Sequence, residues 1–183
     1  MKICLINPPQ ILNKRFGVPS IFQPLGLLYI AAVLEKQHQV EVIDASLEGW
    51  ENLKEIGGEY YLGLTIDEIE RRIKRIKPNV VGISVPFSIN EKIALTIAAL
   101  AKAIDKDITT ILGGAHPSAR PNETIAYDCI DFITVGEGER TINELLEKID
   151  RGAYDELSSV DGICYKENNR PILTSPRDWI ADI

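Results

Sequence analysis

The sequence has few cysteines, few histidines and no long hydrophobic run. Its 183 residues include three Cys, two His and one Met. Cys4, Cys129 and Cys164 are too far apart in the sequence to indicate a disulfide framework or a zinc site. No apolar stretch is long enough to cross a bilayer, and the first residues are typical of a strand, not of a signal peptide. We therefore expect a cytoplasmic protein that has no membrane partner.

Acidic side chains outnumber basic ones. The chain has 27 Asp and Glu against 20 Lys and Arg, which gives a formal net charge of −7 at pH 7. This balance argues against a nucleic-acid partner, which a basic surface would favour. The hydrophobic content of 45% is ordinary for a globular protein, and the length is sufficient for a real core.

Five apolar segments rich in β-branched residues alternate with helical patterns. This alternation predicts a doubly wound, mostly parallel five-stranded sheet of the flavodoxin-like or Rossmann-like α/β class. A hairpin is expected beyond it, at Gly162–Lys166 and Pro171–Thr174, so that residues 1–155 form the α/β domain and residues 156–183 a hairpin and linker. The five expected strands are Lys2–Ile6, Gln39–Ile43, Val80–Ser84, 108–112 and Asp131–Val135.

Helix signals differ in clarity along the chain. Leu25–Lys36 is apolar on most sides, which predicts a well-buried helix after Pro24. Thr65 with Glu68, and Ser88 with Glu91, have the spacing of capping boxes. Residues 45–64 carry several glycines and no clear period, so they are expected to be either a functional loop or a mobile decoration.

The carboxyl ends of the expected strands are followed by loops of small residues and proline. Ligands of open α/β sheets bind at this edge, near the switch point of strand order. Gly113-Gly114 leaves no side chain at such a strand end, so a ligand could approach the backbone closely. The loops favour a bulky ligand over a small polar substrate; they are Asn7–Gln10, Ser84–Phe87, Gly113–His116 and Gly136–Glu139.

Several other ligands and activities lack their motifs. Asn7-Pro8-Pro9 cannot form the G-x-G-x-x-G turn of a dinucleotide site, and Asp44 is then expected to anchor a loop. A response-regulator receiver would need acids where Asn7 and Ser84 stand. There is no G-x-S-x-G elbow for nucleophilic hydrolysis. A flavin mononucleotide site stays open, although the first loop is not rich in Ser or Thr.

His116 is the most prominent single polar residue at this edge. After two glycines, its imidazole could contact a ligand, act as an acid or base near neutral pH, or fix the loop through a hydrogen bond to backbone. Glu139 is accounted for by the acidic first turn of a helix. His38 precedes the second strand, away from the expected site, and is expected at the surface.

In order and spacing, six segments resemble the cobalamin-binding domain at the N-terminus of many radical S-adenosylmethionine enzymes. They cover most of the chain, from residue 3 to about residue 146. The segments are Asn7-Pro8-Pro9, Pro24–Leu27 with Tyr29–Ala31, Val40–Asp44, Val81–Ser84, Gly113–Pro117 and Val135–Glu139.

The resemblance implies that cobalamin lies over the carboxyl edge, with its nucleotide tail threaded into the domain. Ser84 would lie near the dimethylbenzimidazole, and Gly113-Gly114 would give the tail room. No catalytic residue and no metal ligand is implied. The implied cofactor-binding residues are Asn7, Pro8, Pro9, Leu25, Gly26, Ser84, Val85, Pro86, Phe87, Gly113, Gly114, His116, Gly136, Glu137 and Gly138.

Two departures from better-known patterns refine this expectation. The first loop lacks the Asp-x-His-x-x-Gly that supplies a cobalt ligand, so base-off cobalamin without a histidine lower ligand is expected. The chain also lacks Cys-x-x-x-Cys-x-x-Cys. S-adenosylmethionine and a [4Fe-4S] cluster are therefore expected only in a radical S-adenosylmethionine domain, absent here and joined in cis.

The fragment alone is then a non-catalytic module, and its parent is expected to be a methyltransferase or oxidoreductase. Two alternatives remain: a ligand-free interaction or regulatory domain of the same fold, and a flavodoxin-like electron carrier that binds flavin mononucleotide.

Overall fold

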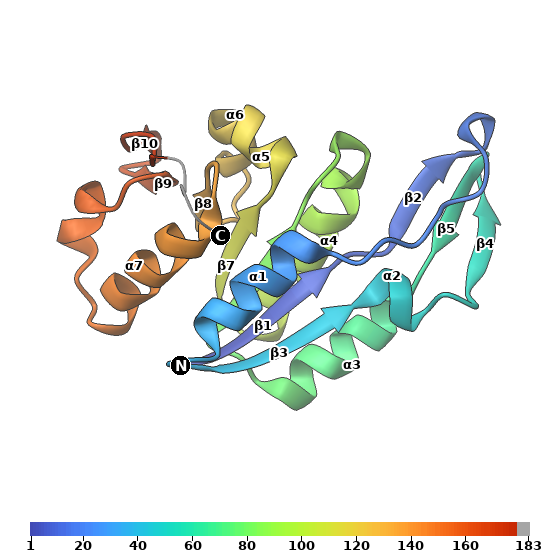
Figure 1. Cartoon of the computed structure of the whole chain (residues 1–183), viewed down its shortest axis with the longest axis horizontal. Helices are drawn as coiled ribbons and strands as arrows, with labels where there is room; N and C mark the ends of the chain where they lie inside the picture. Colours follow the sequence, from blue (N-terminus) through green and yellow to red (C-terminus); the bar gives the residue numbers. More distant parts are fainter. Residues whose placement is uncertain (179–183) are drawn as a thin grey trace.

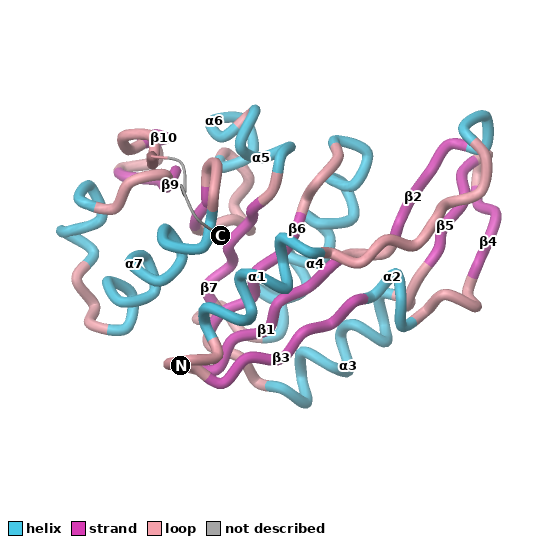
Figure 2. Tube along the Cα trace, in the orientation of Figure 1, coloured by secondary structure: helices cyan, strands magenta, loops and turns pink. Residues whose placement is uncertain are grey.

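A seven-stranded sheet forms the centre of the computed structural model, which describes residues 1–178 (Figure 1, Figure 2). Its strand order is β10-β9-β8-β7-β6-β1-β3. The five strands from β3 to β8 run parallel, so the predicted α/β class is confirmed. These strands are β1 (Lys2–Asn7), β3 (Gln39–Asp44), β6 (Val80–Ser84), β7 (Thr109–Gly113) and β8 (Phe132–Thr134).

The predicted hairpin is present but does not stand apart from the sheet. Strands β9 (Ile163–Glu167) and β10 (Arg170–Leu173) are antiparallel, and β9 pairs with β8. Asn168 and Asn169 form the turn at φ 50° and 59°, values that Asn tolerates better than most residues. The sheet thus has seven strands where the parallel pattern alone predicted five.

Helices cover both faces of the sheet (Figure 1). On one face lie α1 (Leu25–Leu34), α7 (Gly138–Asp150) and the 3₁₀ segment η3 (Tyr154–Ser159), which follows α7 in the chain. On the other lie α3 (Ile66–Ile76), α4 (Glu91–Ile104) and α6 (Pro121–Ile125). The short helix α5 (Ala115–Ala119) connects β7 to α6.

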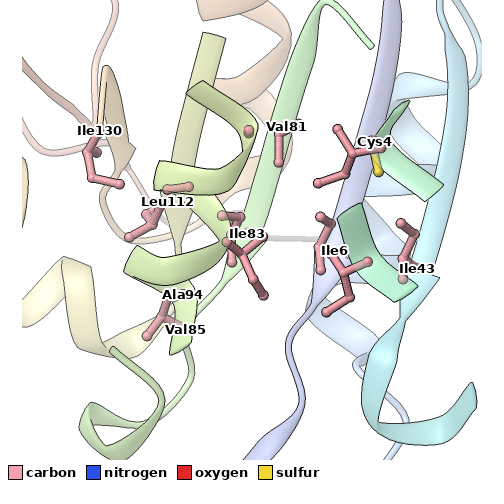
Figure 3. Packing of buried hydrophobic residues seen from close by; sticks show 14 of the residues in the cluster. Cys4, Ile6, Ile43, Val81, Ile83, Val85, Ala94, Leu112 and Ile130 are labelled. Carbon is pink, nitrogen blue, oxygen red and sulfur yellow. The ribbon is translucent and has the colours of Figure 1, made fainter. Parts of the chain in front are cut away.

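Alternate strand residues divide the core into two clusters. Val81, Ile83 and Val85 pack on the α3/α4 face, as Figure 3 shows together with Ile6 and Leu112. Because successive strand side chains point to opposite faces, Gly82 and Ser84 face α1 and α7. The first cluster is continuous, whereas the second meets short side chains at the carboxyl edge.

The prediction that the first helix is well buried is wrong. Leu27 and Leu34 are buried against the sheet, but Leu28 is 41% and Tyr29 50% exposed. The helix lies on the surface of the sheet with nothing among residues 1–178 packed over its outer side. An apolar pattern all around a helix predicts burial, but it does not say whether the covering element belongs to the same part of the chain.

The segment 45–64 is ordered as a helix and a hairpin. After α2 (Ala45–Glu48), strands β4 (Leu53–Ile56) and β5 (Glu59–Leu62) turn at Gly57-Gly58, and β5 pairs with β2 (Gln10–Asn13). The 3₁₀ turn η1 (Lys14–Phe16) follows β2. The resulting three-stranded sheet extends away from the main one (Figure 1). The loop after β1 is therefore held by a second sheet.

One of the two expected capping boxes exists. Thr65 Oγ1 accepts from the Glu68 backbone N–H, and Glu68 Oε2 accepts from the Thr65 N–H at 2.8 Å. The prediction of a capping box at Ser88 is wrong, because Ser88 begins the 3₁₀ turn η2 (Ser88–Asn90) and α4 starts only at Glu91. Both Ser88 and Glu91 have another partner, described below.

The described part of the C-terminal tail is bonded to the rest of the domain. Arg177 Nε donates to Thr141 Oγ1 at 2.8 Å, and its guanidinium pairs with Glu144 of α7. Ser175 O accepts from the Gly162 N–H at 2.8 Å. Residues 179–183, which the linker prediction also covers, lie outside the described residues.

Candidate functional site

A cavity of about 580 Å³ opens at the carboxyl edge of the parallel strands. It lies where β1 and β6 adjoin, at the switch point of strand order, between the N-terminal ends of α1 and α7. The loops after β1, β6, β7 and β8 all contribute to its wall. A volume of this size is within the range of ligand pockets in proteins, which is roughly 300–1,000 Å³.

The floor of the cavity is a row of short side chains. Ser84 pairs with Gly113 across β6 and β7, and Gly82 pairs with Leu5 and Ile111. All five residues line the cavity, as does Thr134 of β8. Larger side chains at positions 82, 84 and 113 would occupy the space between the sheet and the two helices. The cavity is therefore encoded by residue size at alternate strand positions.

Most residues predicted from the sequence lie in the cavity wall. Pro9, Val85 and His116 do not: Pro9 and Val85 are buried beside it, and His116 lies behind the loop that follows β6. The predicted residues that line the cavity are Asn7, Pro8, Leu25, Gly26, Ser84, Pro86, Phe87, Gly113, Gly114, Gly136, Glu137 and Gly138.

Sequence reasoning missed part of the wall. Leu5, Gly82 and Ile111 could have been found from the alternation of strand side chains, since they precede predicted residues by two positions. Phe22 and Gln23 lie in a loop without a sequence signal. Gln10 and Glu139 belong to loops expected at this edge but were not among the predicted cofactor-binding residues. The other lining residues outside that set are Leu5, Phe22, Gln23, Pro24, Leu27, Ile30, Gly82, Ile83, Asn90, Ile111, Thr134 and Ile142.

His116 connects two loops of the site. Its Nδ1 lies 2.9 Å from Ser88 Oγ, its Nε2 lies 3.0 Å from Glu91 Oε1, and the residue is only 5% exposed. Its backbone N–H donates to Val85 O at 3.1 Å. Of the three roles left open for this residue, these contacts favour the loop-fixing one.

Gly114 has a structural requirement of its own. Its φ is +111°, and a Cβ placed there would lie 2.9 Å from the Val85 carbonyl oxygen. A Cβ on Gly113 would lie 2.6 Å from Thr134 Oγ1. The two glycines thus line the cavity and also permit close packing of protein atoms, so a side chain at position 114 would disturb the fold as well as the cavity.

Two amide side chains from the first loop have fixed orientations. Asn7 Nδ2 donates to Asp44 Oδ1 at 2.8 Å and to Ser46 Oγ at 3.0 Å. Gln10 Nε2 donates to Ser20 O at 2.8 Å. Asp44 caps α2 by accepting from the Leu47 N–H, which confirms the sequence interpretation of Asp44 as a loop anchor. Both Asn7 and Gln10 line the cavity, whereas Asp44 does not.

The charge of the wall is acidic. Glu137 and Glu139 stand at the start of α7, and the described lining includes neither Lys nor Arg. The helix N-terminus offsets part of this negative charge with its backbone N–H groups. The wall is nevertheless poorly suited to a phosphate monoester dianion, which cationic side chains would stabilise.

Large apolar side chains surround the mouth. Phe22 is 71%, Leu25 59% and Phe87 68% exposed, and all three line the cavity. Leu28 and Tyr29 continue this surface along the outer side of α1. An apolar rim of this kind is typical of a site that is covered by a ligand or by another protein surface.

Comparison with known families identifies the family of this chain. The B12 binding domain family matches residues 17–146, which include most of the cavity wall. The chain belongs to the B12 binding domain family. It is thus a B12-binding module, which confirms the cobalamin-binding domain that the sequence resemblance implied.

Curated relatives are longer than this chain. An uncharacterized methyltransferase of Pyrococcus horikoshii is 33% identical over 184 aligned residues, which span all of this chain and 36% of the relative. Cytidylyl-2-hydroxyethylphosphonate methyltransferase of Streptomyces wedmorensis is 32% identical over 179 residues, 96% of this chain and 33% of the relative. The chain therefore spans about a third of the length of these two relatives.

Solved structures share the fold at lower identity. The cobalamin-dependent S-adenosylmethionine radical enzyme OxsB with aqua-cobalamin bound superposes with a TM-score of 0.71 at 23% identity, over 97% of this chain and 22% of OxsB. The radical S-adenosylmethionine methyltransferase TsrM of Kitasatospora setae, with its tryptophan substrate and the S-adenosylmethionine analogue aza-SAM bound, superposes with a TM-score of 0.71 at 19% identity. The match covers 96% of this chain and 30% of TsrM.

The cysteines are not arranged as ligands. Burial raises the pKa of the Cys4 thiol to about 12 and that of Cys164 to about 11, so both are inert core residues at neutral pH. Within residues 1–178 no three His, Cys, Asp or Glu side chains are grouped as a metal site would require. In the same range no helix is long and apolar enough to cross a membrane.

Proposed function

We propose that the cavity receives the nucleotide tail of cobalamin and that the corrin ring rests at its apolar mouth. The observation that carries this proposal is the row Gly82, Ser84 and Gly113, whose small size leaves the space beneath the mouth. When bound, cobalamin would supply methyl-carrier chemistry to the full-length protein. The residues of this chain would bind and orient it.

The composition of the wall favours cobalamin over flavin mononucleotide. Cobalamin carries a phosphodiester with one negative charge, whereas flavin mononucleotide ends in a phosphate monoester. The two glutamates and the absence of Lys and Arg from the described lining disfavour the latter. The first loop contributes Pro8, which has no backbone N–H group, and the amides of Asn7 and Gln10 to the cavity wall.

The position of the histidines favours a base-off mode without a histidine lower ligand. His116 is buried behind the wall with Ser88 and Glu91 beside its ring nitrogens. His38 follows α1 at the opposite end of the sheet, where its ring lies 3.4 Å from the N-terminal amine. Neither residue lines the cavity.

The size of the relatives and the exposed apolar surface support a longer parent protein. We infer that a radical S-adenosylmethionine domain, joined in cis beyond a hairpin and linker at residues 156–183, covers the rim formed by Phe22, Leu25 and Phe87. That domain would hold S-adenosylmethionine and the [4Fe-4S] cluster. The parent would then catalyse methyl transfer or a related radical reaction.

A binding experiment tests the cavity. The chain is mixed with hydroxocobalamin, desalted, and its visible spectrum recorded. We expect corrin absorbance to be retained by the unsubstituted chain and lost in Ser84→Leu, because the leucine side chain would fill the floor of the cavity. Ser158→Leu is the matched control, because Ser158 is exposed on η3, away from the cavity.

Each outcome bears on the proposal. If Ser84→Leu retains as much cobalamin as Ser158→Leu, the tail does not enter this cavity. If the unsubstituted chain retains no cobalamin at micromolar concentrations, a ligand-free regulatory domain becomes the better interpretation. A spectrum typical of nitrogen coordination from a histidine would refute the base-off mode without a histidine lower ligand.

A further inference from the structure

Asp44 determines which atom of Asn7 faces the cavity. A carboxylate has no proton to donate at neutral pH, so the Asn7 atom 2.8 Å from Asp44 Oδ1 must be the amide nitrogen. Ser46 Oγ, which donates to the same carboxylate oxygen at 3.1 Å, accepts the second Asn7 proton at 3.0 Å. Both protons of the Asn7 amide are therefore used inside the protein.

The remaining polar atom of the Asn7 side chain is Oδ1. It accepts from no donor within the described part of the chain, and Asn7 is only half-buried at the cavity wall. Gln10 repeats the arrangement, since its Nε2 is bound to Ser20 O. Asn7 thus offers a carbonyl oxygen, and not an amide N–H group, to whatever enters the cavity.

We propose that Asp44 is a positioning residue that acts through Asn7, and that the Asn7 carbonyl oxygen selects an uncharged hydrogen-bond donor on the ligand. This inference rests on the proposed cobalamin site. Two parts of cobalamin have the required chemistry: the carboxamide N–H groups at the edge of the corrin and the hydroxyl of the tail ribose. A carboxylate at the same position would meet an acceptor and be rejected.

A double-mutant cycle on cobalamin affinity distinguishes positioning from a merely structural role. Asp44→Asn keeps a side chain that can cap α2. Because its amide can both donate and accept, however, it can bond to either the nitrogen or the oxygen of the Asn7 side chain and no longer fixes the orientation of Asn7. We expect hydroxocobalamin to bind about three- to tenfold more weakly, the loss of one net hydrogen bond. Asn7→Leu should cost as much, and Asp44→Asn should have no further effect in the Asn7→Leu background.

Additive effects of the two substitutions would overturn the proposal, as would unchanged affinity in Asp44→Asn. Asp105→Asn is the matched control, because Asp105 also accepts from a local backbone N–H but lies at the opposite end of β7. Cobinamide, which lacks the nucleotide tail, separates the two donors. An equal loss for cobinamide indicates a corrin carboxamide, and a loss confined to hydroxocobalamin indicates the ribose.

A measurement without ligand tests the orientation independently of the proposed function. In ¹⁵N-labelled protein the Asn7 side-chain N–H₂ should exchange with solvent at least tenfold more slowly than that of Asn168, an exposed turn residue. Exchange as fast as that of Asn168 would refute the fixed orientation even if cobalamin binds, whereas slow exchange without cobalamin binding would refute only the proposed function.

Discussion

His116 Nδ1 lies 2.9 Å from Ser88 Oγ, so a buried imidazole on the segment after β7 holds the loop after β6. The same ring places Nε2 at 3.0 Å from Glu91 Oε1 at the start of α4. The loop held in this way supplies Pro86, Phe87 and Asn90 to the cavity wall.

Removal of this imidazole should destabilise the protein. In His116→Ala we expect the free energy of unfolding to fall by about 1–3 kcal/mol, because Glu91 and Ser88 lose their partner and a buried ring is deleted. Urea titration monitored by circular dichroism measures the change. His38→Ala, which alters a less buried ring at the other end of the sheet, should change it by less than about 0.5 kcal/mol. Equal losses in both variants would contradict the inter-loop role.

Gly114 and Gly136 should respond differently to alanine. Both have positive φ, +111° and +79°, but a Cβ meets the Val85 carbonyl oxygen at 2.9 Å only in Gly114 and meets nothing within 4 Å in Gly136. Gly136→Ala should therefore lose about 1 kcal/mol of stability from backbone strain. Gly114→Ala should lose about 3 kcal/mol, because overpacking against backbone is added. Thermal unfolding of the two variants in parallel checks the order.

The capping box at Thr65 should make stability depend on pH. Hydrogen bonds from the Thr65 N–H and hydroxyl lower the pKa of Glu68 below its ordinary value. A lowered folded-state pKa stabilises the protein above the unfolded pKa of Glu, and that contribution is lost as the pH falls through the folded value. Thr65→Ala should cost about 1 kcal/mol at pH 7 and less at pH 3.

Urea titrations at the two pH values measure this difference. Thr96→Ala is a suitable control, since the Thr96 hydroxyl donates to a carbonyl within α4 and touches no carboxylate. The same loss at pH 3 and pH 7 in Thr65→Ala would show that Glu68 does not take part.

The main sheet could be predicted from the sequence because its strands are buried on both faces. Val80–Ser84, for example, contains the β-branched aliphatic residues Val80, Val81 and Ile83, and the predicted bounds of that strand equal the observed ones. The second sheet could not be recognised in the same way, since β4 is exposed along its length and β2 only partly buried. The Gly57-Gly58 pair was a usable hairpin signal within that segment.

The site was predictable in its location and less so in its contacts. Parallel strands bring their carboxyl ends to one edge, so the loops that meet at the cavity follow from topology. The partners of His116 are 28 and 25 residues away in sequence, and no local pattern indicates them. The spacing of Ser88 and Glu91 wrongly predicted a capping box. In the structure the two side chains contact the ring nitrogens of His116 instead.

The alternation along β6 has a consequence for how this domain can vary. Val81 and Ile83 belong to the continuous core under α3 and α4, although Ile83 also borders the cavity, whereas Gly82 and Ser84 face α1, α7 and the cavity. Stability and ligand choice are thus assigned to neighbouring positions of one strand that point in opposite directions. Substitutions at the cavity-facing positions of β6 could therefore change which ligand the domain binds, while the core-facing residues between these positions preserve the fold.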